Sequence, residues 1–222
     1  MPTHLIDLPV QTRAAALLPG TANSEARTVE LVWSTGAPVR RRDPATGDPY
    51  DEVLVLDAGA CDLSRLNGGA PLLNAHGAWA LSGVIGVVER AWIADGAGRA
   101  VVRFSDRAEV EPIWRDVAAG VIRNVSVGYV VRAYEISNDR VPVWRAVNWQ
   151  PLELSAVPVG ADAGASFRST EPNHPCQIIR HQEATMPDEP IAQPEPTPEP
   201  PSPPPDPNGV ADQAVAAERA RI

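Results

Sequence analysis

Short runs in which apolar and polar residues alternate dominate the chain from about residue 28 to residue 159. Alternation of this kind predicts β-strands, because successive side chains of a strand point to opposite faces. We expect strands at 28–34, 52–56, 83–92, 100–104, 124–134, 142–149 and 152–159. The turn residues at 95–98 predict a β-hairpin between two of these runs.

One segment carries helical spacing instead. Its apolar residues recur every three or four positions: Val110, Ile113, Trp114 and Val117. A proline inside a helix costs about 3 kcal/mol, so we expect the helix to begin near Glu111 with Pro112 in its first turn. Gly120 is a plausible stop. The sequence therefore predicts a mainly β protein with few helices.

A serine stands inside the apolar run 124–131. Alternation puts four large residues on one face of this strand: Val125, Val127, Tyr129 and Val131. Ser126 and Gly128 share the other face, where there is almost no side-chain bulk. This face has room for an extended peptide backbone.

Two further polar residues lie where apolar ones are expected. His76 ends the apolar run 71–75, and Glu153 alternates with a face expected to be buried, formed by Leu152, Leu154 and Ala156. A buried carboxylate is costly unless it has a partner. Together with Ser126, these residues supply the hydroxyl, imidazole and carboxylate that activate a serine nucleophile.

Each of the three residues also has an ordinary structural interpretation. A strand serine is usually structural, and a histidine near an apolar run usually has its hydrogen bonds satisfied in the core. Glu153 could pair with Arg123 or Arg132. Spacing alone does not establish that the three side chains meet.

The net charge of −9 is unevenly distributed. Residues 183–207 contribute −6 and leave −3 for the rest of the chain, which therefore offers no basic surface for nucleic acid. The two cysteines, Cys61 and Cys176, fit no metal spacing, and Cys176 is expected outside the core; a reducing cytosol is the simplest interpretation. No signal peptide, membrane span, metal or cofactor is predicted.

Composition divides the chain into four segments. We expect a flexible N-terminal arm at 1–27, a folded domain at 28–168, a proline-rich acidic linker at 169–209 and the start of a helical, scaffold-like segment at 210–222. Eleven prolines within 187–207 favour an extended, disordered linker. The last segment has no stop signal, so the chain looks like the front part of something longer.

Several blocks resemble, in order, those of the tailed-phage prohead maturation protease family. The blocks are LLNAH at 72–76, GVIGVV at 83–88, NVSVGY at 124–129 and ELSAVPVGADAGA at 153–165, with TGAPVRRRD at 35–43 also similar. The resemblance covers roughly residues 28–168. This family is distantly similar to the herpesvirus assembly protease, so the resemblance implies a β-barrel of that type.

The resemblance also implies a function. Ser126 would be the nucleophile, His76 the general base and Glu153 the third member of a serine endopeptidase. Such an enzyme cleaves scaffold or capsid-protein extensions, and itself, within the procapsid in the host bacterial cytoplasm. Its partners would be the major capsid protein and scaffold segments as substrates, with self-association inside the procapsid and no nucleic acid or membrane.

Two positions depart from the family pattern. Many members carry an acidic residue directly after the histidine, where this chain has Gly77, and many carry proline where it has Gly160. The first departure bears on how His76 is oriented. The alternative function is therefore a catalytically weak or inactive capsid assembly or scaffolding protein that keeps the protease barrel.

Overall fold

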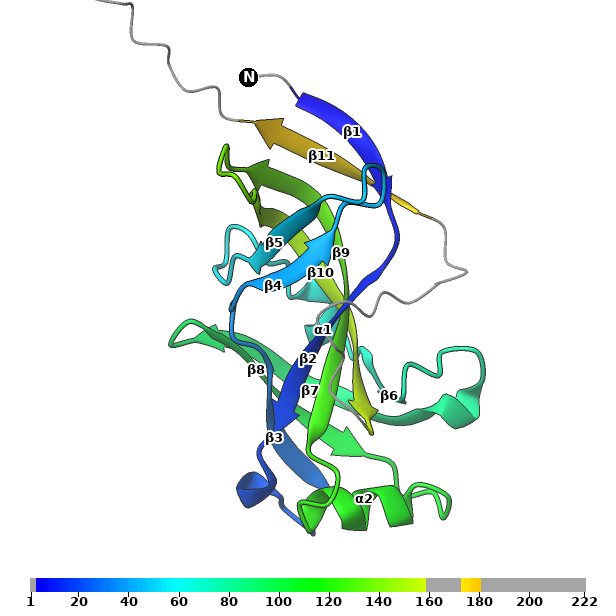
Figure 1. Ribbon diagram of the computed structural model, residues 1–222. Helices are drawn as coiled ribbons and strands as arrows, with labels where there is room; N and C mark the ends of the chain where they lie inside the picture. Colours follow the sequence, from blue (N-terminus) through cyan, green and yellow to red (C-terminus); the bar gives the residue numbers. More distant parts are fainter. Residues whose placement is uncertain (1–2, 159–172, 181–222) are drawn as a thin grey trace, which may run out of the picture. The chain divides into compact units, whose positions relative to one another are not determined.

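The computed structural model describes residues 3–158 and 173–180 (Figure 1). These residues form eleven strands: β1 (Thr3–Leu8), β2 (Gln11–Leu17), β3 (Thr28–Ser34), β4 (Val39–Arg42), β5 (Pro49–Leu54), β6 (Pro71–Asn74), β7 (Val84–Ala94), β8 (Ala97–Phe104), β9 (Asn124–Ile136), β10 (Val143–Val157) and β11 (His174–Arg180). Two α-helices, α1 (Ser64–Asn67) and α2 (Glu111–Ala118), and two single turns of 3₁₀-helix, η1 (Pro19–Thr21) and η2 (Leu81–Gly83), complete the described elements. The predicted mainly β architecture with few helices is confirmed.

Seven of the strands close into a barrel. Following the hydrogen-bonded order, these are β9, β2, β3, β8, β7, β6 and β10, and the pairing of β10 with β9 closes the ring. A closed barrel leaves no strand edge exposed within it. The further likeness to the herpesvirus assembly protease stays a prediction.

The hairpin of β9 and β10 extends beyond the barrel (Figure 1). The later part of β10 pairs with β6, and its beginning, Val143–Ala146, pairs with β5. Beyond the barrel, β4 adds to β5, while β11 and β1 add to the side of β9. One long hairpin therefore belongs both to the barrel and to a flanking sheet.

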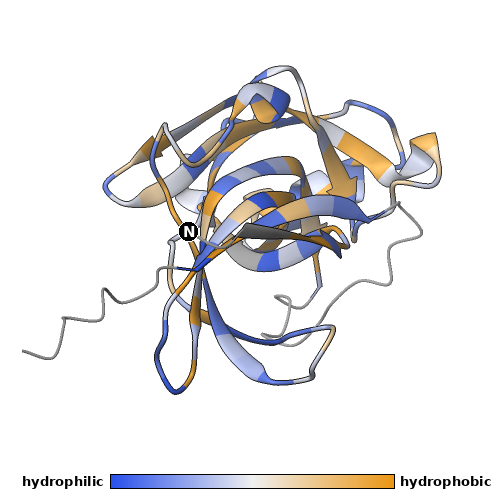
Figure 2. Ribbon diagram, turned by 90° about the horizontal axis from the view of Figure 1, so that it is seen from above, coloured by the Kyte–Doolittle hydropathy of each residue, from blue (hydrophilic) through white to orange (hydrophobic). Residues whose placement is uncertain are grey.

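Aromatic side chains fill the interior of this fold. Trp33 and Trp149 are fully buried with their rings 5.9 Å apart, and Tyr129 meets Trp149 edge-on at 5.7 Å. Edge-to-face contacts of this kind add to the stabilisation from burial. Seen from above, the strands curve around the core and their residues alternate between hydrophobic and hydrophilic (Figure 2).

Helix α2 begins where the sequence predicts. Pro112 lies in its first turn, where its missing N–H breaks no helical hydrogen bond. Trp114 and Val117 are buried against the core. The helix ends before Gly120, whose φ of +71° is the left-handed conformation that glycine favours.

The prediction of a flexible arm over 1–27 is wrong for residues 3–17. These residues form β1 and β2, and β2 is a barrel strand that pairs with both β9 and β3. The sequence of β2 gives little warning, because alanines occupy its centre and alternation is weak. The hydrogen bonds to its two neighbouring strands hold these residues in a strand, although their own preference for strand conformation is weak.

The domain boundary predicted at residue 168 is also wrong. Residues His174–Arg180 form β11, which lies between β1 and β9, so this part of the predicted linker is a strand. Cys176, expected outside the core, is fully buried in it, as is Ile178. The remaining linker and the helix predicted at 210–222 lie outside the described residues.

Two predicted strands are in fact one. The runs 142–149 and 152–159 belong to β10, whose pairing with β9 is interrupted at Ala146–Asn148–Trp149 and at Pro151–Glu153. Such irregularities shift the alternation of side chains and make one strand look like two.

Within the described part of the chain, no helix is long and apolar enough to cross a membrane.

Candidate active site

A tight turn after β6 presents His76. Ala75 and His76 both adopt left-handed backbone conformations, with φ of 47° and 60°. The Ala75 N–H donates to the Ala156 carbonyl at 2.8 Å and fastens the turn to β10. Left-handed conformations are unfavourable for residues other than glycine, and they concentrate at functional sites.

Glycine at position 77 completes this turn. The Gly77 N–H donates to the Asn74 carbonyl at 2.8 Å, and a Cβ at position 77 would lie 2.9 Å from that oxygen. A larger side chain would force the turn to open. The departure from the family pattern at Gly77 is thus compatible with a well-defined position for His76.

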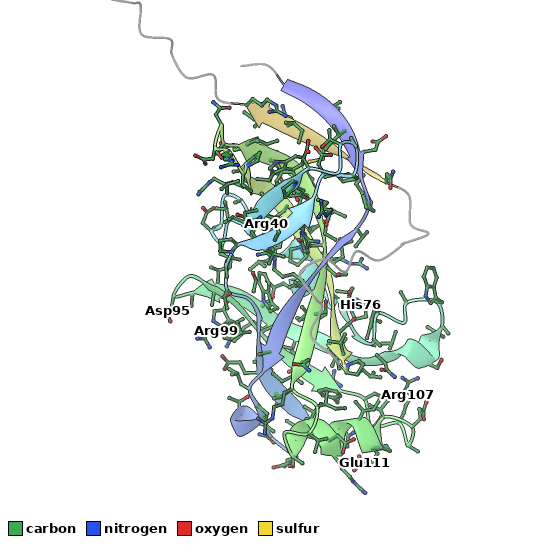
Figure 3. All side chains as sticks on the ribbon, in the orientation of Figure 1. Arg40, His76, Asp95, Arg99, Arg107 and Glu111 are labelled. Carbon is green, nitrogen blue, oxygen red and sulfur yellow. The ribbon has the colours of Figure 1, made fainter. Side chains whose placement is uncertain are left out.

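His76 and Glu153 are in direct contact. His76 Nδ1 lies 2.7 Å from Glu153 Oε1, and both side chains are largely buried, with 10% and 16% of their surface exposed. Figure 3 shows His76 beside the barrel strands. A carboxylate at Nδ1 fixes the imidazole tautomer and stabilises the imidazolium, as in serine hydrolases.

Ser155 links the same two residues. Its hydroxyl donates to Glu153 Oε2 at 2.6 Å, accepts from the His76 backbone N–H at 3.2 Å, and also lies 3.2 Å from His76 Nδ1. The sequence did not single out Ser155. The signal was present in its position two residues after Glu153, because residues two apart in a strand share a face.

Ser126 occupies the neighbouring strand. It pairs directly with Ser155 across the β9–β10 ladder, and the next pair on the same face is Gly128 with Glu153. Directly opposed residues have Cβ atoms about 4.5–5.5 Å apart. The structure therefore places Ser126 one side chain away from the His76–Glu153 pair.

The environment of Ser126 is unusual. Its side chain is fully buried, and its hydroxyl has no hydrogen-bond partner among the residues that the structure describes. An unsatisfied buried hydroxyl is rare and costly inside a protein, so this position calls for a specific explanation. Gly128 leaves room for the Glu153 side chain, because a Cβ at position 128 would collide with the Glu153 carboxylate.

The expectations for Glu153 are met only in part. Leu154 and Ala156 are buried in the core, but Leu152 is only partly buried. Neither Arg123 nor Arg132 pairs with Glu153: Arg123 donates to the Gly120 carbonyl, and Arg132 binds Asp62 and Gln150. Its partners are His76 and Ser155.

A pocket of about 260 Å³ opens beside this pair. Its walls are formed by Val10, Thr12, Arg65, Pro71, Leu73, His76, Ala78, Trp79, Leu152 and Glu153. Ser126 does not line it. The pocket thus gives access to the imidazole and carboxylate from the outside of the barrel.

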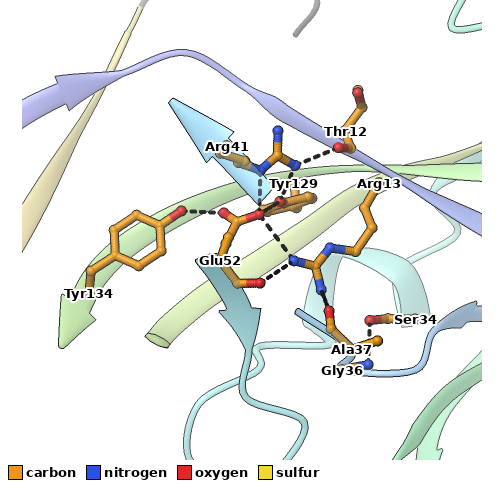
Figure 4. A network of polar contacts seen from close by, with 9 residues as sticks. All are labelled: Thr12, Arg13, Ser34, Gly36, Ala37, Arg41, Glu52, Tyr129 and Tyr134. Atoms are coloured by element: carbon orange, nitrogen blue, oxygen red, sulfur yellow. Dashed lines mark hydrogen bonds and ion pairs between the residues drawn. The ribbon is translucent and has the colours of Figure 1, made fainter. Parts of the chain in front are cut away.

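Among the described residues, the fully buried carboxylate is Glu52 on β5, beside the barrel, and not Glu153 (Figure 4). Arg41 Nε lies 2.6 Å from Glu52 Oε2 and Arg13 Nη2 lies 3.2 Å from it, while the hydroxyls of Tyr129 and Tyr134 donate to the same carboxylate. Burial alone would raise the pKa of Glu52, but the two guanidinium groups and the two hydroxyls lower it overall.

The Glu52 cluster ties β2, β4, β5 and β9 together. Arg41 Nη2 also donates to the carbonyl of Thr12, which lines the pocket beside His76, at 2.7 Å. The sequence did carry a signal for this carboxylate, because Glu52 shares one strand face with two buried residues, Tyr50 and Leu54. The cluster therefore braces one wall of the candidate site.

Comparison with known proteins connects the chain to phage capsids. Over 136 residues, 60% of its length, it is 44% identical to a protein named major capsid protein from Halomonas phage phiHAP-1. The matched segment is 23% of that protein, so the chain spans about a quarter of the relative's length. No protein-family model and no solved structure matches the chain.

This similarity bears on the predicted function in one respect. It supports a capsid-related protein of phage origin. The resemblance to the prohead protease family, the peptidase activity and the roles of the three residues stay predictions.

Proposed function

We propose that this chain acts in phage capsid assembly and that its barrel is a serine endopeptidase. The observation that carries the activity is the 2.7 Å contact between His76 Nδ1 and Glu153 Oε1, with Ser126 on the adjoining strand. The similarity to a phage major capsid protein supports the place of action, in or on the forming shell.

The mechanism follows from the roles that these groups can take. Ser126 Oγ attacks a peptide carbonyl while His76 takes the hydroxyl proton, which it then gives to the leaving amine. The resulting acyl-enzyme is hydrolysed by water through the same imidazole. Glu153, at Nδ1, holds the ring so that Nε2 is the nitrogen that exchanges the proton.

Access of the peptide substrate to Ser126 is the step of this mechanism that the structure restricts most. Ser126 is fully buried, so a peptide reaches it only after neighbouring groups move. Catalytic hydrogen bonds often form only when substrate is bound, which fits the absence of a partner for the Ser126 hydroxyl. Activity would then be low until the protein is assembled with its substrate.

The proposed substrates are extensions of capsid or scaffold proteins, including the chain itself. The matched segment makes up 23% of a relative whose name is major capsid protein. In that protein the segment that matches this chain and the remaining three quarters share one polypeptide. This arrangement supports cleavage within the same chain.

The second candidate is a capsid assembly protein without peptidase activity. The name of the relative, major capsid protein, favours this candidate directly, since it describes a structural protein. The burial of Ser126 favours it as well. In this case the His76–Glu153–Ser155 cluster would serve only to fix the turn after β6 to β10.

Co-expression with the major capsid protein of the same phage separates the two candidates. Mass spectrometry of the purified particles should show truncated capsid or scaffold chains with the wild-type protein and intact chains with Ser126→Ala or His76→Ala. Ser82→Ala, at an exposed serine, is the control that should leave processing unchanged. Truncation that persists in both variants would contradict the endopeptidase, whereas assembly with no processing in any sample would support the second candidate.

A further inference from the structure

We propose that the pocket beside His76 and Glu153 binds one large apolar side chain of the substrate, and that Trp79 determines this preference. The proposal rests on the proposed endopeptidase, because it names the substrate class of that site. It concerns a part of the pocket to which neither the candidate triad nor the comparison assigns a role.

The walls of the pocket are mostly apolar. Five of its ten lining residues carry no polar side-chain atom, and Trp79 adds a largely apolar ring with a single N–H: the five are Val10, Pro71, Leu73, Ala78 and Leu152. Burying an apolar side chain against such walls contributes about 25 cal/mol for each Å² removed from water. The hydrophobic effect therefore favours an aliphatic or aromatic occupant over a polar one.

The size of the pocket suits a single side chain. Its volume of about 260 Å³ is below the roughly 300–1,000 Å³ of pockets that enclose drug-sized ligands. Two polar residues of its lining, His76 and Glu153, already contact each other. A peptide residue that fills the pocket would therefore lie beside the proposed general base.

The charges of the pocket argue against a basic occupant. Arg65 is exposed, and it is the one residue of the lining with a permanent positive charge. A lysine or arginine entering the pocket would meet this guanidinium, and the Glu153 carboxylate that could compensate is engaged by His76 and Ser155. An apolar residue meets no such penalty.

Trp79 is the lining residue whose exposed ring is available for contact with the substrate. It is 71% exposed, in the segment between the His76 turn and η2, and it lines the pocket. A large exposed aromatic side chain is typical of a binding surface, because it offers contact area with few rotatable bonds. Since Trp79 is outside the core, it can be replaced without disturbing the fold.

Leu81 provides a matched control. It is 86% exposed and lies two residues beyond Trp79, but it lines a different pocket, beside Arg107 and Phe104. Trp79→Ala and Leu81→Ala thus both remove exposed apolar surface from this segment. Only Trp79→Ala removes a wall of the pocket beside His76.

The first experiment digests a proteome-derived peptide library with the full chain and identifies the cleaved bonds by mass spectrometry. We expect Leu, Met or Phe to be enriched at one fixed position relative to the cleaved bond. For such peptides Trp79→Ala should lose about tenfold in kcat/KM, mainly through KM, whereas Trp79→Phe and Leu81→Ala should stay near the wild type. Cleavage with no apolar preference, or with a preference unchanged in Trp79→Ala, would overturn the proposal.

The second experiment does not depend on catalysis. Fluorescent peptides from the same library, with either Leu or Ala at one position, are titrated onto full-chain Ser126→Ala with and without Trp79→Ala. Tighter binding of the Leu series that disappears with Trp79→Ala supports the pocket, even if the co-expression experiment shows that the endopeptidase is wrong. Equal binding of the two series would overturn the pocket, whatever the outcome for cleavage.

Discussion

His76 Nδ1 lies 2.7 Å from Glu153 Oε1, although 77 positions separate the two residues in the chain. The contact exists because β6, which ends just before His76, pairs in parallel with the part of β10 that carries Glu153. The barrel therefore builds the pair, and the strained turn at Ala75 and His76 aims the imidazole at the carboxylate.

Replacing Glu153 by Gln should be milder than replacing Ser126 or His76. The amide keeps the size of the side chain but can no longer compensate an imidazolium, so the base is weakened rather than removed. We expect a loss of processing rate about one to two orders of magnitude smaller than for Ser126→Ala, measured by single-turnover cleavage. A silent Glu153→Gln variant would mean that another group, with Ser155 the nearest, orients His76.

Replacing Glu52 by Gln should destabilise the fold. The change leaves Arg13 and Arg41, which are 5% and 7% exposed, without their counter-charge. Breaking a buried ion pair from one side costs about 3–5 kcal/mol, which urea unfolding would measure. The control is Glu89→Gln, which removes an exposed partner of Arg103 and should cost about 0–1 kcal/mol.

The same cluster predicts how stability depends on pH. The pKa of Glu52 is lowered in the folded protein relative to its ordinary value of 4.5, so its contribution to stability is present above that value and is lost as the pH falls toward the folded pKa. The wild type should therefore lose more stability than Glu52→Gln between neutral pH and pH below 4.5. Parallel losses in the two proteins would show that other carboxylates dominate.

The two cysteines should react slowly in the folded protein. Burial raises the pKa of both Cys61 and Cys176 to about 12, and the charges of Asp62 and Asp57 add to the effect at Cys61. The thiolate is the reactive form, so alkylation by iodoacetamide at mildly alkaline pH should be slow until denaturant is added. Labelling of either residue at the rate of a free thiol would contradict its placement in the core.

Replacing Ile178 by Ala tests whether β11 belongs to the folded domain. Ile178 is 1% exposed, and truncating a buried isoleucine costs about 2–5 kcal/mol. Gln177→Ala, at an exposed position on the same strand, should be nearly neutral. If the two variants unfold at the same urea concentration, the core ends before β11, as the sequence alone suggested.

The sequence predicts the parts of this fold in which local pattern and tertiary contact agree. Alternation in β9 identifies Val125, Val127 and Tyr129 as residues of the apolar core, although the opposite face around Ser126 is buried as well, and the proline rule places the start of α2 at Glu111. It fails for β2 and β11, which are strands because they pair with barrel neighbours and not because their residues alternate strongly.

The candidate site was likewise predictable only where local sequence pattern determines it. Isolated polar residues in apolar runs singled out His76 and Glu153, and the structure brings these two together. The strand faces of Ser155 and Glu52 could be read from the sequence, but their partners could not, because these contacts join residues distant in the chain. Local pattern gives the face of a strand but not what lies opposite it.

Covalent labelling of Ser126 tests the central claim most directly. A fluorophosphonate probe reacts with an activated serine, whose oxygen bonds to phosphorus as fluoride leaves, and peptide mass spectrometry locates the adduct. We predict one adduct at Ser126, formed on the assembled protein with its capsid partner, and its loss in His76→Ala. An adduct at Ser155, or no adduct on an assembled protein that processes its capsid chains, would contradict Ser126 as the nucleophile.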